Sequence, residues 1–349
     1  MSRVLVTGHD GYIGVRLVPI LQEAGHEVVG LDSGLFSECG FGDPPPSIPT
    51  IQVDIRDVTA EQCEGFDAVL HLAGLSNDPL GDLNPDLTFD INHRGTVNVA
   101  KQAKAAGVER FVFSSSCSLY GRHGDDFLDE HASFNPVTPY GESKVLAERD
   151  VLPLADDSFS PTFLRNATAY GLSSRLRGDL VVNNLTAYAF TTGEVLMKSD
   201  GTPWRPLVHI DDISRAFLAV LGAPRDLVHG EAFNVGSTEE NYQVRDVAEL
   251  VEELVPNSRV EFAEGAAPDL RCYRVNCDKI TETLGFETKW TVRTGIEELV
   301  EAYARFGLTL DELHGSGLMR IQHVREMLDD GRLGTDLRWA GAPIGAGHG

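Results

Sequence analysis

A tyrosine and a lysine stand four positions apart in the segment PYGESK (residues 139–144). At that spacing Tyr140 and Lys144 share one face of a helix. A free phenol, with a pKa of about 10, is a poor base at neutral pH, but a nearby ammonium favours the phenolate and lowers that pKa. Tyr140 would then take a proton from a substrate alcohol. Ser116, in the serine-rich run FSSSCSLYG, would hydrogen-bond the same oxygen.

The glycine-rich segment TGHDGYIG (residues 7–14) directly follows an apolar run and precedes an apolar helix. Glycines in such a turn let the backbone approach a pyrophosphate, and the helix N-terminus supplies free N–H groups. Asp32 stands 18 residues after Gly14, at the end of the second expected strand. A carboxylate there suits both ribose hydroxyls of an adenosine. Because it would repel a 2′-phosphate, we expect NAD rather than NADP.

Residues at two further strand ends are candidates for contacts with adenine and ribose. Asp54 and Ile55 end the third expected strand, and Leu72 and Ala73 end the fourth. Open parallel sheets bind ligands at the carboxyl ends of their strands. Either pair taken alone is equally consistent with packing. Asn92 is expected to hold the loop that follows the fifth strand.

These candidates need a scaffold, and the first half of the chain alternates β-rich and helical runs. Strand, helix and strand in series predict a doubly wound parallel sheet of the α/β class. The spacing of apolar residues in Phe89–Ala106 predicts one helix. The expected strands are Arg3–Thr7, His26–Asp32, Ile51–Asp54, Ala68–Ala73, Arg110–Ser115 and Thr162–Arg165.

The alternation weakens after Gly171, which predicts a smaller mixed α/β region over the sheet. We assign residues 1–171 to a Rossmann-like cofactor-binding domain, to which 206–236 return. Residues 172–205 and 237–340 are expected to bind substrate, and 341–349 to form a flexible tail. Helices are predicted over Gly178–Thr192, Asp211–Leu221, Val244–Val255, Thr294–Phe306 and Gly317–Leu328, and extended runs over Pro203–Ile210 and Phe233–Gly236.

Together these motifs resemble the extended short-chain dehydrogenase/reductase family, in its nucleotide-sugar epimerase/dehydratase branch. The resemblance covers nearly the whole chain and includes TGHDGYIG, HLAG, FSSSCSLYG, PYGESK, VHIDDISRA and FNVG. It implies that Ser116, Tyr140 and Lys144 are the catalytic triad and that the protein is a homodimer formed through two helices per subunit. The cofactor-binding set that it implies is Gly8, Gly11, Tyr12, Ile13, Gly14, Asp32, Ser33, Asp54, Ile55, Leu72, Ala73, Asn92, Tyr140, Lys144 and Ala167.

The resemblance leaves several reactions open, and two positions favour one of them. Dehydratases of the family carry an extra acid and base directly after the strand-ending serine or threonine, where this chain has Cys117 and Ser118. We therefore expect an NAD-dependent nucleotide-sugar 4-epimerase that works through a 4-keto intermediate. A dehydratase, a decarboxylase and a 4-dehydrogenase or reductase remain alternatives, and an NAD-binding module without catalysis is disfavoured because the tyrosine and lysine are present.

The family also implies residues for the nucleotide-diphosphate sugar. Asn184 and Leu185 lie in a segment that resembles the family's NNL run, and two arginines, Arg205 and Arg271, resemble phosphate-binding ones. Arginine suits this role because its planar fork binds phosphate oxygens in pairs. Thr168 stands where related enzymes place a substrate-binding asparagine, so the sugar stays open, as does the base of the nucleotide.

Composition excludes several other classes of function. The 349 residues include 53 acidic and 29 basic side chains, a formal net charge of −24, and such a surface repels nucleic acid. No apolar run approaches the roughly 18 residues of a membrane span. Five cysteines without CxxC spacing argue against a zinc site or a disulfide scaffold. With no secretion signal at the first residues, we expect a cytoplasmic protein without a metal.

Overall fold

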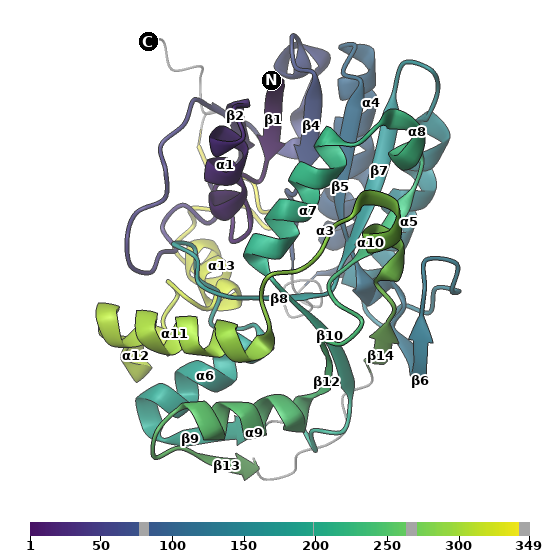
Figure 1. Ribbon diagram of the computed structural model, residues 1–349. Coiled ribbons are helices and arrows are strands. Elements are labelled where there is room, and N and C mark those ends of the chain that lie inside the picture. Colours follow the sequence, from purple (N-terminus) through teal and green to yellow (C-terminus); the bar gives the residue numbers. More distant parts are fainter. Residues whose placement is uncertain (77–83, 198, 263–270, 342–349) are drawn as a thin grey trace.

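The computed structural model describes residues 1–76, 84–197, 199–262 and 271–341. At its centre these residues form a parallel sheet of seven strands in the order β11-β7-β5-β4-β1-β2-β3 (Figure 1). The order reverses beside β1, which is where open sheets of this kind bind ligands. The strands are β1 (Arg3–Thr7), β2 (Glu27–Asp32), β3 (Thr50–Gln52), β4 (Ala68–His71), β5 (Arg110–Ser116), β7 (Ser160–Asn166) and β11 (Ala232–Val235).

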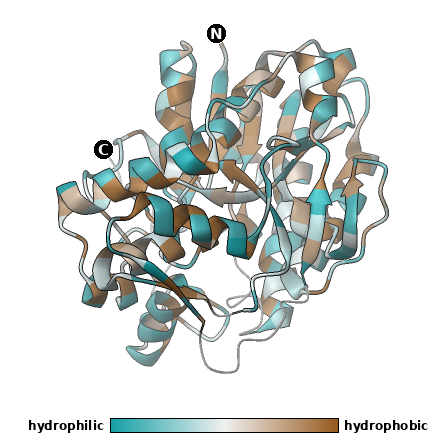
Figure 2. Ribbon diagram, turned by 60° about the horizontal axis from the view of Figure 1, so that its bottom comes forward, coloured by the Kyte–Doolittle hydropathy of each residue, from teal (hydrophilic) through white to brown (hydrophobic). Residues whose placement is uncertain are grey.

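The doubly wound parallel sheet is therefore confirmed, with every strand end within two residues of the predicted one. Every pairing within it is parallel. Apart from the short edge strand β3, its strands are buried on both faces, which is why they read as continuous apolar runs rather than as alternating ones. Figure 2 shows hydrophobic residues along the central strands, whereas the outer helices carry both hydrophobic and hydrophilic residues.

Helices cover both faces of this sheet. Helices α1 (Gly14–Glu23) and α7 (Ile210–Gly222) pack on one face through side chains such as Leu17 and Phe217. Helices α4 (Thr96–Ala105) and α5 (Pro139–Val151) pack on the other face, through side chains such as Val99 and Ala147. In Figure 1, α1 and α7 lie in front of the strands and α4 lies behind them. Helix α7 and strand β11, which lie within residues 206–236, belong to this layer.

A second region lies below the carboxyl ends of the strands in Figure 1. It is built around a separate hydrophobic cluster to which α6 and α11 contribute Leu185 and Leu299. Its elements are β8 (Thr168–Tyr170), α6 (Val181–Thr192), β9 (Glu194–Met197), β10 (Trp204–His209), β12 (Asn241–Gln243), α9 (Val244–Leu254), β13 (Arg259–Phe262), α11 (Val292–Phe306) and α12 (Leu310–His314). The remaining shorter elements are α3 (Pro85–Thr88), β6 (Arg122–Leu128), α8 (Arg225–Val228), β14 (Cys272–Val275) and α10 (Asp278–Leu284).

Two local predictions are refined by the structure. The predicted helix Phe89–Ala106 is two consecutive pieces, a wider π-helical turn η3 (Phe89–Gly95) followed by α4. Helix α13 (Arg320–Asp329) begins three residues after the predicted start, and its Val324 and Met327 pack in the cluster under β1 and β2. The division into cofactor-binding and substrate-binding parts stays a prediction, and the predicted tail lies almost wholly outside the described residues.

Three findings bear on the classes of protein weighed from composition. None of the described helices is long and apolar enough to cross a membrane. Within the described ranges, no group of histidine, cysteine and acidic side chains is arranged to bind a metal ion. All five cysteines are free thiols.

Candidate active site

A cavity of about 810 Å³ opens at the carboxyl ends of the central strands. It is continuous from the glycine loop to the predicted catalytic residues and on to the second region. The predicted residues that line it are Gly8, Gly11, Tyr12, Ile13, Gly14, Asp32, Ser33, Asp54, Ile55, Leu72, Ala73, Ser116, Tyr140, Lys144, Ala167, Thr168, Asn184, Leu185, Arg205 and Arg271. The fold thus brings together every predicted site residue except Asn92.

The glycine loop has the shape of a cradle that side chains would fill. Gly8 has a φ of +74°, and a Cβ on it would lie 2.7 Å from the backbone nitrogen of Ala73. A Cβ on Gly14 would lie 2.3 Å from the carbonyl oxygen of Gly8. No side chain caps the N-terminus of α1, so the positive end of its dipole faces the cavity lined by this loop. These features fit a bound pyrophosphate.

Asp32 and Asp54 define what we call the adenosine end of the cavity. The backbone N–H of Gly34 donates to Asp32 Oδ1 at 2.9 Å, and burial raises the pKa of that carboxyl. Burial acts on Asp54 too, but hydrogen bonds from Arg56 outweigh it and hold the pKa of Asp54 below its usual range. Arg56 Nη2 lies 2.6 Å from Asp54 Oδ2. Both carboxylates stand at strand ends, as an adenosine site requires.

Asn92 does not line the cavity but holds one of its walls. Its Oδ1 accepts from the backbone N–H of Leu75 at 2.7 Å, and its Nδ2 donates to the carbonyl oxygen of the same residue at 2.8 Å. Leu75 lies in the loop after β4, so the prediction that Asn92 holds the loop after the fifth strand was wrong. The π-helical turn around Asn92 shifts the register of the helix and aims the amide at that loop.

Tyr140 and Lys144 are positioned by the first turns of α5. Thr138 caps this helix by accepting a hydrogen bond from the backbone N–H of Gly141 at 3.2 Å. The Lys144 ammonium donates to the carbonyl oxygen of Ser114 at 2.8 Å. It also lies 4.6 Å from the ring centroid of Phe113 and 5.6 Å from that of Tyr140. Ser116, at the end of β5, lines the same part of the cavity, which we call the catalytic end.

The Lys144 side chain is buried at the wall of the cavity, and burial lowers its pKa to about 7. One helical turn further on, Glu148 pairs with Arg165 of β7 at 2.8 Å. Glu148 also accepts a hydrogen bond from Ser115 Oγ. This buried pair ties α5 to β5 and β7, and it therefore fixes the height of Tyr140 and Lys144 above the strand ends.

Cys117 and Ser118 differ in where their side chains lie. The Cys117 thiol is buried and donates to the carbonyl oxygen of Arg165 at 3.0 Å, and burial raises its pKa well above the usual range. Ser118 lines the cavity together with Tyr273. At these two positions, therefore, the cavity receives one hydroxyl and no carboxyl.

The part of the cavity predicted to bind substrate carries one functional candidate that the sequence did not reveal. Arg177 is 5% exposed and lines the cavity. Its Nη2 donates to Asp179 at 2.8 Å, and its Nη1 donates to Ser76 Oγ at 2.9 Å. An arginine two residues before an aspartate predicts only a local ion pair. Its place in the cavity depends on Ser76, which is 101 residues away in the sequence.

Two predicted arginines lie close together on the same side. Arg205 donates through Nη1 to the carbonyl oxygen of Arg271, and both side chains line the cavity. The C-terminal part of the chain adds further lining residues that sequence analysis placed elsewhere or not at all, namely Met319, Arg320, Ile321 and Leu337. With Arg56 at the adenosine end, five arginines among the described residues thus line the cavity of a protein with strongly negative net charge.

Comparisons with known proteins agree with this geometry. The sequence model of the NAD dependent epimerase/dehydratase family matches residues 4–236. UDP-glucose 4-epimerase of Homo sapiens is 30% identical over 337 residues, which is 86% of this chain and 94% of that protein. MoeE5 in complex with UDP-glucuronic acid and NAD has a TM-score of 0.76 and 27% identity, over 87% of this chain and 99% of that one. The UDP-glucose 4-epimerase of Thermotoga maritima with UDP-glucose has a TM-score of 0.75 and 26% identity, with the same coverage.

Proposed function

This chain belongs to the NAD-dependent epimerase/dehydratase family, and we propose that it is a 4-epimerase of UDP-linked sugars. The residues that would hold NAD are the glycine loop, the N-terminus of α1 and the carboxylates of the adenosine end. The chemistry that NAD supplies when bound is reversible acceptance of a hydride from carbon C4 of the sugar.

The protein's own residues handle the proton of the C4 hydroxyl group. Tyr140 accepts that proton on its phenol oxygen and later returns it, so the reaction consumes no external acid or base. Ser116 hydrogen-bonds the same sugar oxygen and orients it. Lys144 brings a positive charge to the Tyr140 ring from 5.6 Å, which favours the phenolate form.

The observation that carries the proposal is the set of acids in the cavity. Among the described lining residues, the carboxylates are Asp32, Asp54 and Asp179. The first two lie at the adenosine end, and the third is paired with Arg177 at 2.8 Å. Elimination of water across C5 and C6 needs a further acid and base beside the sugar, and position 118 supplies only a hydroxyl. Oxidation and reduction at C4 need no further group.

The lining arginines support a diphosphate substrate, because a guanidinium binds phosphate oxygens in pairs. We propose uridine as the base, and a hexose or a uronic acid as the sugar, because the relatives are enzymes or complexes of UDP-glucose and UDP-glucuronic acid.

We further propose a cytoplasmic homodimer that associates through α4 and α5, two helices that pack side by side in one subunit. Free cysteines support the compartment, and light scattering after gel filtration tests the dimer.

Proton NMR in D₂O tests the reaction. Purified protein with added NAD would be incubated with UDP-glucose, UDP-glucuronic acid and dTDP-glucose in turn. We expect the 4-epimer of at least one UDP-sugar with no deuterium on any ring carbon, because only a hydroxyl proton exchanges. Deuterium at C5 with a new 6-methyl signal would mean a dehydratase, and loss of C6 as carbon dioxide would mean a decarboxylase. Either result, or no turnover of any sugar, would overturn the proposal.

A further inference from the structure

The segment after α13 folds back over the adenosine end of the cavity. Residues 333–340, which we call the C-terminal clasp, form a tight loop in which the backbone N–H of Gly334 donates to the carbonyl oxygen of Arg338 at 2.8 Å. A β-bridge joins Leu333 to Trp339. Leu337 is 7% exposed, lies in the hydrophobic cluster under β1 and β2, and lines the cavity.

Two contacts attach the clasp to the residues that surround the adenosine end. The indole N–H of Trp339 donates to the carbonyl oxygen of Ser33 at 2.8 Å, directly after Asp32. Arg338 pairs with Asp57, at the end of the short turn that follows Asp54. The clasp therefore contacts both strand-end segments that an adenosine would touch, one after β2 and the other after β3.

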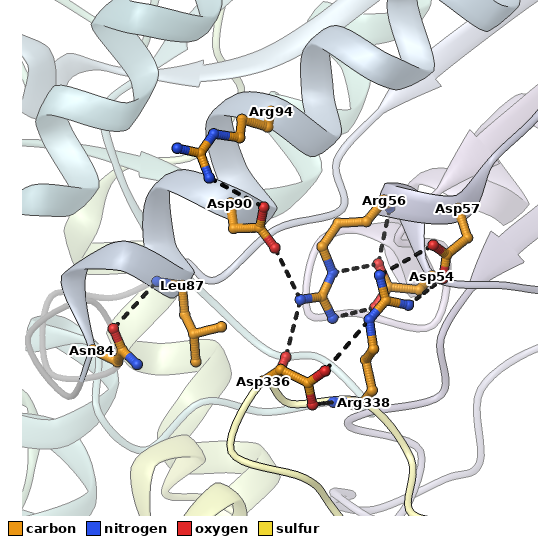
Figure 3. Close-up of polar contacts among 9 residues, drawn as sticks. All are labelled: Asp54, Arg56, Asp57, Asn84, Leu87, Asp90, Arg94, Asp336 and Arg338. Atoms are coloured by element: carbon orange, nitrogen blue, oxygen red, sulfur yellow. Dashed lines mark hydrogen bonds and ion pairs between the residues drawn. The ribbon is translucent and has the colours of Figure 1, made fainter.

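Arg56 joins the clasp to the Asp54 carboxylate. Its guanidinium donates to both Asp54 oxygens, at 2.6 and 3.0 Å, to Asp90 at 3.2 Å, and to the carbonyl oxygen of Asp336 at 3.0 Å. The side chain is only 6% exposed. Figure 3 shows Arg56 between these groups, with Arg338 next to it and bonded to Asp57 and Asp336. A shift of the clasp would thus move the Asp54 carboxylate, because the Arg56 guanidinium is bonded to both.

We propose that the C-terminal clasp is the outer wall of the adenosine end and slows the release of NAD, with Arg56 as the positioning residue that couples it to Asp54. The inference rests on the proposed use of NAD but not on which sugar reacts. A buried guanidinium shared by four acceptors has little freedom to move, so the clasp and the Asp54 carboxylate keep one relative position. Leu337 supplies the apolar part of the wall.

Binding of NAD and of ADP-ribose, measured by calorimetry, tests the clasp without using activity. A chain ending at Gly331 would lack the clasp, and a chain ending at Gly341 would keep it and serve as the control. We expect the shorter chain to bind both ligands roughly tenfold more weakly or worse, which corresponds to about 1.4 kcal/mol. ADP-ribose lacks the nicotinamide, so an equal loss for the two ligands would locate the effect at the adenosine end.

Because Leu333 and Leu337 are part of a hydrophobic cluster, a point variant decides the question if the shorter chain does not fold. Arg338→Ala removes the pair with Asp57 and should speed dissociation of NAD by about threefold, within the range of a half-exposed ion pair. Arg293→Ala is the matched control, since it removes a similarly exposed bidentate pair with Glu253, and neither residue lines the cavity. Equal rates of NAD dissociation from Arg338→Ala and from the control would overturn the proposal that the clasp slows the release of NAD. Failure of the unaltered protein to bind NAD would instead overturn the proposed function.

Discussion

The catalytic end and the adenosine end of one cavity handle buried charge differently. At the catalytic end, the Lys144 ammonium donates to a backbone carbonyl oxygen, and burial lowers its pKa to about 7. At the adenosine end, the Arg56 guanidinium binds both oxygens of Asp54 and reaches Asp90 as well. An ammonium with a pKa near neutrality can lose or gain a proton during a reaction, whereas a guanidinium paired with carboxylates keeps its charge and its position. Lys144 can therefore change its protonation state, while Arg56 holds Asp54 in place.

Removing the phenol oxygen at the catalytic end should have the largest effect, because it lowers turnover without weakening the binding of NAD. Tyr140→Phe is expected to lower kcat by about 10²- to 10⁴-fold, the usual contribution of a positioned general base, and to leave the dissociation constant of NAD nearly unchanged. Steady-state kinetics and calorimetry measure the two quantities. Tyr242→Phe is the control, because its hydroxyl bonds to Glu240 outside the cavity. Retained turnover in Tyr140→Phe would show that another group moves the proton.

Replacing the buried lysine should change how stability depends on pH. The folded-state pKa of Lys144, about 7, lies below the ordinary lysine value. Between pH 7 and pH 10 the unfolded state therefore binds more protons at this position, so this group makes the free energy of unfolding rise with pH. Lys144→Met has no titrating group at this position. Between pH 7 and pH 10 we therefore expect the free energy of unfolding of the unaltered protein to rise by up to a few kcal/mol relative to that of Lys144→Met.

Urea unfolding followed by circular dichroism at pH 7, 8 and 9 measures the difference. Lys289→Met, which alters an exposed lysine, should follow the unaltered protein. Parallel pH profiles for Lys144→Met and the unaltered protein would mean that the ammonium at the catalytic end is not destabilised by burial.

A change in the rigid cradle between the two ends should have the smallest effect of the three. Gly14→Ala would place a Cβ 2.3 Å from the carbonyl oxygen of Gly8, and overpacking of this kind costs roughly 1–3 kcal/mol. We expect NAD affinity to fall by about tenfold. Gly222→Ala, where a Cβ meets no atom within 4 Å, is the control. Unchanged NAD affinity in Gly14→Ala, measured by calorimetry, would place the pyrophosphate away from this loop.

The amino-acid sequence by itself determined the local parts of this protein. The strand over Arg3–Thr7, the glycine turn after it and the helix that places Tyr140 and Lys144 on one face all follow from residue type and short spacing. Backbone sterics and helical periodicity act over a few residues, so a sequence reports them directly. The same local logic indicated that position 118 brings no carboxyl group to the site.

Only the tertiary structure decided how distant segments complete the cavity. Asn92 holds the loop after β4 rather than the one after β5, because a π-helical turn changes the direction of its side chain. Arg177 enters the cavity through Ser76, and Arg56 meets Asp336 across 280 positions of sequence. Contacts of that kind depend on which elements the packed core brings side by side. No spacing rule reports them, since hydrophobic packing is non-directional and sets neighbours by shape and volume.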